Sequence, residues 1–190
     1  AQESLTVRII SGEFRGRKLA TPRGVKIRPT ADRLRESIFN ILGPAVAHTT
    51  VLDLFAGTGA LGLEALSRGA RSAVFVDIGG KALDLVGKNI VALDLSDRTH
   101  VLRWDIRRNL ACLGHWKQGF DLIFMDPPYG RNLVIPTLAH LSSSEALAAK
   151  AHLVVEQSSD EHVAPARVGF RLVDQRLYGD TIVCFLNDAV

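Results

Sequence analysis

From Thr50 onward the chain alternates short, almost continuously apolar runs with stretches of helical periodicity, and this alternation limits its possible folds more than any other feature. The apolar runs are residues 51–55, 73–77, 100–104, 121–126 and 153–157. Strands that are buried on both faces of a parallel sheet have this composition, because helices cover both faces. Between these runs, residues 60–68 and 82–93 carry apolar side chains at helical spacing. The pattern therefore predicts successive βαβ units around a parallel sheet.

The end of the chain departs from this alternation. Residues 171–178 and 181–186 have the composition of two strands, but only Gly179 and Asp180 separate them. Such a short connection fits a tight hairpin and is far too short for a helical crossover. We therefore expect an α/β fold with a Rossmann-like, mostly parallel, seven-stranded sheet that ends in an antiparallel hairpin.

Length and cysteine content add three expectations. A chain of 190 residues is long enough to bury a full core as one compact unit. No apolar run approaches the roughly 18 residues of a membrane-spanning helix, and residues 1–10 lack the apolar stretch of a signal peptide. The two cysteines, Cys112 and Cys184, cannot form a disulfide framework. These features favour a reducing, cytoplasmic location, and we expect a monomer.

The positive charge of the chain is concentrated near its first residues. Residues 1–35 hold nine of the 23 arginines and lysines but only three of the 20 aspartates and glutamates. A basic arm on a mildly acidic body is typical of proteins that bind a polyanion, because each cation paired with a phosphate releases counterions. The candidates for RNA binding are Arg8, Arg15, Arg17, Lys18, Lys26, Arg28 and Arg33. A solvated basic face without any ligand is the alternative interpretation.

The arm also has its own predicted elements. Residues 7–11 and 18–21 read as two short strands, and residues 34–42 carry an apolar helical stripe that Gly43 and Pro44 end. We therefore expect a basic extension of a hairpin and a helix at residues 1–48, followed by the main domain at residues 49–190.

A glycine-rich turn follows the first strand of the predicted sheet. Residues 57–62 read G-x-G-x-x-G between a strand and a helix, where glycines let the backbone approach a ligand closely. Asp77 ends the next strand 20 residues after Gly57, a position from which a carboxylate binds a ribose diol. Close packing of the helix on the sheet would also require small residues, but it would not require the acid. The glycine loop and Asp77 together predict a cofactor that contains a nucleoside.

Nicotinamide dinucleotides and S-adenosylmethionine both fit this geometry, and Asp53 favours the second. A carboxylate near the mouth of the loop repels a pyrophosphate and attracts the ammonium of a methionyl group, directly or through water. Asp105 follows the third predicted strand, where open α/β sheets bind ligands, and is able to accept a hydrogen bond from an adenine amine. Capping of a helix is the alternative role for Asp105.

The fourth predicted strand leads directly into Asp126-Pro127-Pro128-Tyr129. The two prolines supply no backbone donors and fix two φ angles, so the elbow is rigid and offers acceptors only. An exocyclic amine on a base is a poor nucleophile, and the Asp126 carboxylate with the Pro127 carbonyl can accept both of its N–H bonds. Tyr129 can stack on a base that has left its neighbours. An ordinary turn at the end of a strand is the alternative.

These motifs resemble those of class I methyltransferases that use S-adenosylmethionine. Residues 8–12, 15–17, 28–40, 61–70 and 178–181 narrow the resemblance to the RsmD family of ribosomal RNA small-subunit guanine-N2 methyltransferases. The resemblance implies methyl transfer to a guanine N2 in small-subunit ribosomal RNA, in an assembled or assembling particle. One departure is the pair Gly79 and Gly80, which stands where a helix should begin.

The resemblance and the motifs together give a set of expected site residues. Catalysis is assigned to Asp126, Pro127, Pro128 and Tyr129. The residues expected to bind S-adenosylmethionine are Asp53, Phe55, Gly57, Thr58, Gly59, Asp77, Ile78 and Asp105. The six histidines show no ligand spacing with either cysteine, so we expect no metal.

Three other functions stay open at this point. An amino-methyltransferase acting on DNA adenine or on a protein glutamine could use the same elbow, although the chain leaves little room for a target-recognition domain. A non-catalytic RNA-binding protein with a vestigial pocket would not need the acids and the elbow intact. A nicotinamide-dependent oxidoreductase leaves Pro127 and Pro128 without a role.

Overall fold

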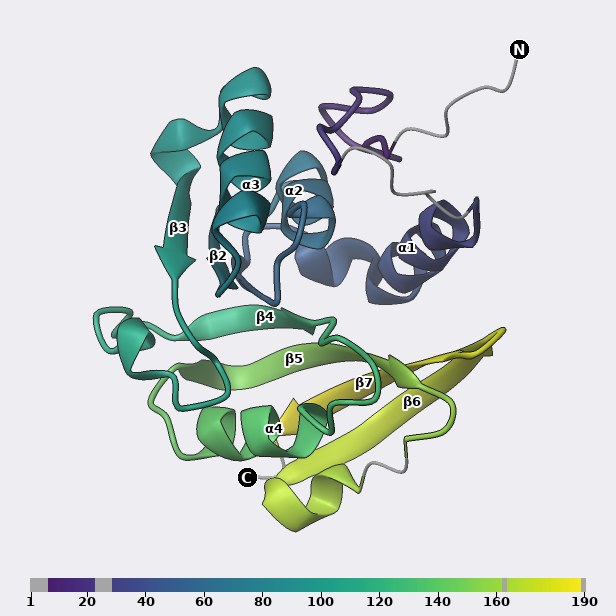
Figure 1. Ribbon diagram of the computed structural model, residues 1–190, viewed down its shortest axis with the longest axis vertical. Helices are drawn as coiled ribbons and strands as arrows, with labels where there is room; N and C mark the ends of the chain where they lie inside the picture. Colours follow the sequence, from purple (N-terminus) through teal and green to yellow (C-terminus); the bar gives the residue numbers. More distant parts are fainter. Residues whose placement is uncertain (1–6, 23–28, 162–163, 189–190) are drawn as a thin grey trace.

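The computed structural model describes residues 7–22, 29–161 and 164–188, which form one seven-stranded sheet with helices on both faces (Figure 1). The strand order is β3-β2-β1-β4-β5-β7-β6. Strands β1 to β5 are parallel, and β7 runs antiparallel to both β5 and β6. The strands are β1 (Thr50–Leu54), β2 (Ser72–Asp77), β3 (Thr99–Arg103), β4 (Phe120–Met125), β5 (Leu147–Ser158), β6 (Phe170–Tyr178) and β7 (Thr181–Asp188). The predicted α/β sheet with a terminal antiparallel hairpin is confirmed.

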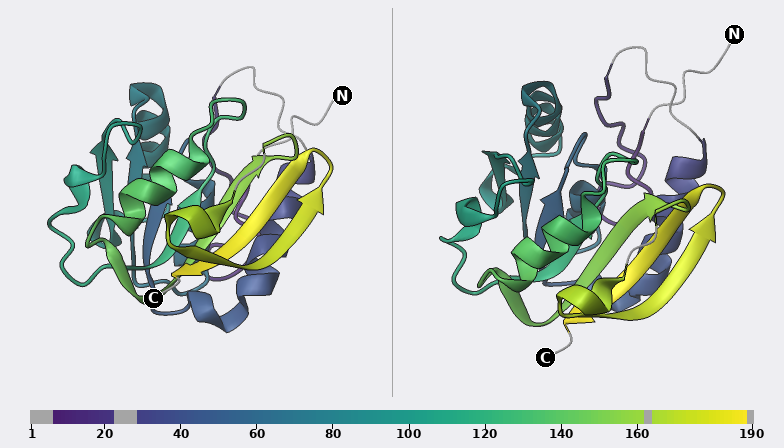
Figure 2. Two further views of the ribbon diagram at one scale, coloured as in Figure 1. Left: turned by 90° about the horizontal axis from the view of Figure 1, so that it is seen from below. Right: turned by 60° about the horizontal axis from the view of Figure 1, so that its bottom comes forward.

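The helices divide between the two faces of the sheet (Figures 1 and 2). Helices α1 (Pro29–Leu42), α2 (Ala60–Ser67) and α3 (Gly80–Ala92) pack one core, and α4 (Val134–Ser142) packs the other. The short 3-10 helices are η1 (Gly43–Val46), η2 (Ser96–Arg98), η3 (Ala111–Leu113) and η4 (Pro165–Val168). Alternate residues of each central strand serve the two cores, so Val51 faces α2 while Leu52 faces α4. Both faces are therefore covered, as the continuous apolar runs predict.

Strand β5 is longer than its apolar run predicts. It begins at Leu147, whereas the sequence indicates residues 153–157. Three of the six residues at 147–152 are alanines, and Lys150 has a φ of +66°; alanine and lysine both have a low strand propensity. Pairing with β4, which shifts register between Phe120 and Leu122, holds this weak segment in the sheet.

Helix α3 begins at Gly80 despite the two glycines in this region. Its N-cap residue Gly79 is extended and offers no side chain, but its N–H donates to Asp77 Oδ1 at 2.7 Å. This hydrogen bond to the last residue of β2 therefore fixes the start of α3, which the two glycines alone specify only weakly.

The first described residues form a compact turn against α2 and α3. The predicted hairpin is present, but it is reduced to one antiparallel bridge between Arg8 and Lys18, flanked by Ile9 N–H donating to Arg17 O at 2.9 Å. Ile9 and Leu19 are buried in the core on the α1–α3 face, so the turn is fastened by packing more than by strand pairing. Of the basic residues predicted for the arm, Lys26 and Arg28 lie outside the described residues. Among the helices that the structure describes, none has the length and apolar character needed to cross a bilayer.

Gly12 makes a close backbone approach where this turn meets α2. Its φ is +83°, and a Cβ added there would lie 1.9 Å from Ser67 O. Glu13 N–H donates to that same oxygen at 2.8 Å. Gly16, at a φ of +82°, has nothing within 4 Å of such a Cβ.

We predict that Gly12→Ala lowers the free energy of unfolding by about 1–3 kcal/mol more than Gly16→Ala does. Both changes carry the same left-handed backbone penalty, so their difference isolates the contact with Ser67. Denaturant unfolding measures the free energies, and hydrogen exchange of the Glu13 amide shows whether the arm lifts from α2. Equal values for the two variants, with Glu13 still protected, would contradict this account.

Candidate active site

Acidic side chains from four neighbouring strands gather at the carboxyl edge of the sheet. Asp53 lies in β1, Asp77 ends β2, Asp126 follows β4 and Glu156 lies in β5. The register aligns Val76, Met125 and Val155, so the acids that follow them share one level, whereas Asp53 pairs with Phe124 and lies two residues deeper in the sheet. Open α/β sheets bind their ligands at this edge, where the strand order reverses.

The glycine loop between β1 and α2 runs over this edge. Phe55, Gly57 and Gly59 have φ values of +60°, +57° and +75°. Gly59 is closely packed, because an added Cβ would lie 3.2 Å from the Phe75 ring. Asn89 from α3 donates to Thr58 O at 3.0 Å and holds the tip of the loop. The Phe75 ring and Asn89 thus hold the loop in place.

The Asp77 carboxylate accepts hydrogen bonds from the glycine loop and from the residue that caps α3. Its Oδ2 accepts from Gly57 N–H at 3.0 Å, and its Oδ1 accepts from Gly79 N–H at 2.7 Å. A carboxylate has about four acceptor positions, so two backbone bonds leave room for a diol. The structure therefore gives Asp77 a positioning role in the free protein in addition to the binding role that the sequence predicts.

A cavity of about 290 Å³ opens beside the loop. Its wall is mainly apolar, and Ile78 at its rim is 49% exposed. The lining residues are Phe55, Ile78, Trp104, Asp105, Ile106, Arg107, Pro128, Arg131 and Leu133. Three of the predicted cofactor residues, Phe55, Ile78 and Asp105, thus share one cavity with the elbow residue Pro128.

The Asp105 carboxylate in this wall is paired with the Arg107 guanidinium. Its two oxygens accept from Arg107 Nε at 2.7 Å and Nη2 at 2.8 Å, and Oδ1 also accepts from Arg107 N–H at 3.2 Å. The hydrogen bond from Arg107 holds the pKa of Asp105 below its usual range. A ligand amine reaching this carboxylate would have to share it with Arg107.

Asp53 lies beneath the loop and is only 3% exposed. Its Oδ2 accepts from Gly62 N–H at 2.9 Å, which fixes the first turn of α2. Burial raises its pKa to about 8, the Gly62 bond lowers it, and the charges of Asp126 and Asp77 raise it further. Because the carboxylate is covered, contact with a ligand above the loop would run through water, one of the two routes that the sequence allows.

The elbow after β4 is held by residues from the last hairpin and from the segment that follows β5. Tyr129 Oη lies 2.9 Å from Thr181 Oγ1, and Gly130 N–H donates to Glu161 Oε1 at 2.8 Å. The Tyr129 side chain is 46% exposed. Asp126 retains an exposed surface, yet the protein around its carboxyl desolvates it and raises its pKa to about 6. The elbow thus leaves Asp126, Pro128 and the Tyr129 ring exposed, while Pro127 is buried.

Glu156 is the residue at this edge that the sequence analysis missed. It is 8% exposed, and burial raises its pKa well above the usual range. Asp126 and Asp53 raise that pKa further, whereas Arg35 lowers it. The signal was present in the sequence, because a glutamate inside an otherwise buried strand is rare without a function or a partner.

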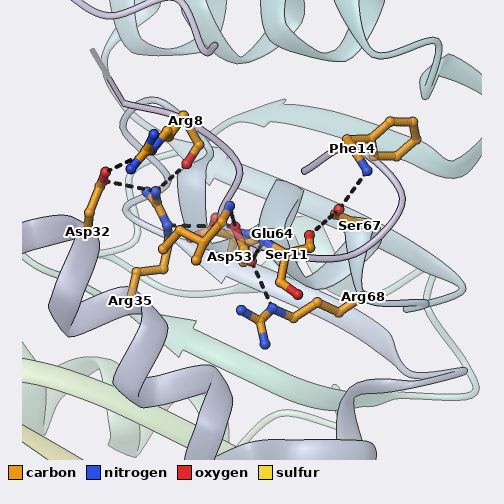
Figure 3. A network of polar contacts seen from close by, with 11 residues as sticks. Arg8, Ser11, Phe14, Asp32, Arg35, Asp53, Glu64, Ser67 and Arg68 are labelled. Atoms are coloured by element: carbon orange, nitrogen blue, oxygen red, sulfur yellow. Dashed lines mark hydrogen bonds and ion pairs between the residues drawn. The ribbon is translucent and has the colours of Figure 1, made fainter. Parts of the chain in front are cut away.

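A second polar network lies behind the edge and joins the arm to α1 and α2 (Figure 3). Glu64, which is fully buried, accepts from Ile10 N–H at 2.7 Å, Ser11 N–H at 3.0 Å and Arg68 Nε at 2.8 Å. Arg35 Nε lies 3.9 Å from Glu64 Oε2, and Arg35 Nη2 donates to Asp32 Oδ1 at 3.1 Å.

The predicted RNA-binding side chains surround this network. Arg8, Arg15, Arg17, Lys18 and Arg33 are all exposed. Arg8, Arg15 and Arg33 line a cavity of about 420 Å³ between the arm and α1. Arg17 differs from the others, because its Nη2 donates to Ala92 O at the end of α3 at 2.6 Å. Within the part of the chain that the structure describes, no group of three or more His, Cys, Asp or Glu could hold a metal ion.

We predict that Asp53 makes the protein less stable as the pH rises. The folded pKa of about 8 exceeds the ordinary 3.8, so between these values the folded chain holds a proton that the unfolded chain releases. The free energy of unfolding then falls by up to about 1.4 kcal/mol per pH unit from this group.

Asp53→Asn keeps an oxygen for Gly62 N–H but cannot titrate. Denaturant unfolding from about pH 5 to about pH 8 should therefore show a shallower decline for Asp53→Asn than for the original chain. Parallel curves for the two proteins would show that Asp53 does not carry the raised pKa.

Comparison with known proteins identifies the family. Residues 7–187 match the family described as Conserved hypothetical protein 95. The chain is 39% identical over 163 residues to "Putative rRNA methyltransferase YlbH" of Bacillus subtilis strain 168, with 86% of this chain and 88% of that protein covered. It is 35% identical over 173 residues to Ribosomal RNA small subunit methyltransferase D of Escherichia coli strain K12, with 91% and 85% covered. A solved structure, "Putative methyltransferase yhhF from Escherichia coli", matches with 33% identity and a TM-score of 0.81 over 96% of this chain and 98% of that one. The resemblance noted in the sequence is confirmed, and the chain belongs to the Conserved hypothetical protein 95 family, the RsmD family of ribosomal RNA small subunit methyltransferases.

Proposed function

We propose that this protein transfers the methyl group of S-adenosylmethionine to the exocyclic N2 of a guanine in small-subunit ribosomal RNA. The single observation that carries the proposal is the elbow at residues 126–129, whose Pro128 lines a mainly apolar cavity of about 290 Å³ beside the glycine loop. Membership of the family and the name of the Escherichia coli relative support ribosomal RNA as the substrate.

The residues at the cavity fit the cofactor. The apolar wall that contains Phe55 and Ile78 suits the adenine ring, and the unused acceptor positions of Asp77 suit the ribose diol. A cationic methionyl group above the loop would favour the ionised form of the buried Asp53 and so lower its raised pKa. When bound, S-adenosylmethionine supplies an electrophilic methyl group.

The elbow orients the nitrogen that receives this methyl group. The lone pair of a guanine amine is delocalised into the ring, so the site gains more from positioning than from removal of a proton before attack. Asp126 and the Pro127 carbonyl accept the two N–H bonds, and the exposed face of Tyr129 stacks on the base. With its pKa near 6, Asp126 is an ionised acceptor at neutral pH, and the methylated nitrogen then loses its proton easily.

The arm supplies affinity for RNA. Arg8, Arg15 and Arg33 line the cavity between the arm and α1 and bind phosphates, and the exposed Arg17 and Lys18 extend this basic surface. All the side chains in this proposal come from one chain, so a monomer suffices. The substrate is an assembled or assembling small subunit. The protein therefore acts in the cytoplasm, together with the ribosomes.

Small subunits from a strain that lacks the family enzyme provide the direct test. Incubation with labelled S-adenosylmethionine should label one guanine, and mapping by mass spectrometry should place the methyl group on N2. Label on another base, on ring nitrogen or on a ribosomal protein would overturn the proposed substrate.

We predict that Asp126→Ala loses on the order of 10²-fold in single-turnover methylation while binding RNA as before. Asp126→Asn keeps a neutral acceptor and should retain partial activity. Turnover of the unsubstituted protein should fall as the pH drops below about 6, because the protonated carboxyl accepts less well. The Asn variant should lack this acidic limb. Rates for Asp126→Ala equal to those of the original chain would rule out the proposed role.

We also predict that Arg15→Ala with Lys18→Ala weakens RNA binding and lowers its salt slope by about one to two, because two phosphate contacts are lost. Lys117→Ala with Arg171→Ala is the matched control, since both side chains are exposed near the opposite edge of the sheet. Affinity for S-adenosylmethionine should stay constant in both double variants. An equal loss of RNA affinity in the control would show that only overall charge matters.

A further inference from the structure

Glu156 stands next to the elbow on the side away from the cofactor cavity. Met125 pairs with Val155 in the parallel register of β4 and β5, so the next residues of these two strands, Asp126 and Glu156, are neighbours. Phe124 and Val154, two positions earlier, both face the core below α1 and α2. By the alternation of side chains along a strand, Asp126 and Glu156 point to that same face.

The Glu156 side chain is buried without a partner of its own. Among residues 7–22, 29–161 and 164–188 it makes no hydrogen bond or ion pair, although it is only 8% exposed. Arg35 is close enough to influence it electrostatically, but that guanidinium is already bonded to Asp32 and to Arg8 O. A buried carboxyl is normally paired, because desolvation without a hydrogen bond is unfavourable. The Glu156 oxygens are not among the fully enclosed unpaired side-chain atoms of the described residues, so this acceptor beside Asp126 is open to a group that arrives with the substrate.

The chemistry of the bases identifies that group, given the proposed function. When an exocyclic amine is held at Asp126 with the Watson–Crick edge of the base toward β5, the next atom along that edge meets Glu156. On this edge of guanine the atom next to the C2 amine is N1, which carries a hydrogen, and O6 follows it. In adenine and cytosine the atom next to the amine is a ring nitrogen with a bare lone pair. The two classes of base thus differ at the atom that meets Glu156.

We propose that Glu156 accepts a hydrogen bond from N1–H of the target guanine and thereby selects guanine over other bases that carry an exocyclic amine. The inference rests on the proposed function and adds a specificity-determining residue to it.

The electrostatics of the edge agree with this role. Burial and the charge of Asp126 favour the neutral form of Glu156, as its raised pKa indicates. A neutral carboxyl has one acceptor and one donor, which match N1–H and O6 of guanine together. Adenine offers the same group only N1, and cytosine offers two acceptors. A site that loses hydrogen bonds with the wrong substrate discriminates strongly, because its buried polar group is left unpaired.

The test compares two substrates that differ only at the target nucleotide identified by the mapping experiment. One small subunit carries guanine there, and the other carries 2-aminopurine, which keeps the 2-amine but has a bare N1 and no O6. The measured quantity is the ratio of kcat/KM for the two substrates. Differences in intrinsic reactivity between the two amines cancel when the ratios of variants are compared.

We expect Glu156→Ala to reduce this ratio at least about tenfold, through loss of rate on guanine alone. Glu156→Gln should keep most of the ratio, because an amide also offers one acceptor and a donor. Thr137→Ala is the control: Thr137 is a buried polar residue of α4, which packs on the other face of the sheet, so the ratio should not change. All three variants should be folded, as circular dichroism shows, and should bind S-adenosylmethionine with the affinity of the original chain.

A Glu156→Ala variant that is folded, binds S-adenosylmethionine and keeps the original ratio would overturn the inference and leave the proposed function intact. An original chain that methylates no guanine in either subunit would overturn the proposed function, and the inference with it.

Discussion

The buried carboxylate of Glu64 is the contact on which the arrangement of the arm, α1 and α2 depends. A fully buried charge is tolerated only when its acceptor positions are filled, and here two backbone N–H groups of the arm and the Arg68 guanidinium fill them. Arg35 brings α1 to the same carboxylate. Removal of one partner would leave a buried charge uncompensated, so the segments that meet at Glu64 hold one another in register. The basic arm is thus part of the folded body, even though its strand pairing is reduced to one bridge.

The same framework fixes the distance between the basic surface and the acidic edge. Arg35 contacts the arm and Asp32 on one side and influences Glu156 on the other. Asn89 forms a second connection, because its Oδ1 accepts from Ala20 N–H at 2.6 Å while its Nδ2 donates to Thr58 O at 3.0 Å. The arm and the glycine loop are therefore held in place relative to each other by short polar contacts through the buried Asn89.

The acidic side chains at the carboxyl edge of the sheet have different surroundings, and these surroundings give them different properties. Asp77 is hydrogen-bonded to two backbone N–H groups and positions the loop, whereas Asp53 is covered and has a pKa near 8. Asp126 keeps contact with solvent and has a pKa near 6. Carboxyl groups this close cannot all be ionised without mutual repulsion, so burial decides which of them carries charge at neutral pH. The exposed one is the one suited to meet a substrate amine.

The sequence by itself determined the sheet, its terminal hairpin, the glycine loop and the elbow. These features follow from local rules: the period of apolar residues, the length of a connection, and the conformations that Gly and Pro permit or forbid. The same rules gave the acids at the ends of individual strands, because Asp77 and Asp126 lie beside such signals.

Only the tertiary structure decided which groups meet. It turned Asp77 toward the loop and buried Glu64 under the arm. It also set Glu156 beside Asp126, although 29 residues lie between them in the sequence. The physical reason is that strand register and burial are collective properties of the folded sheet. The partner and the charge state of a carboxyl depend on residues from distant segments, which no local pattern encodes.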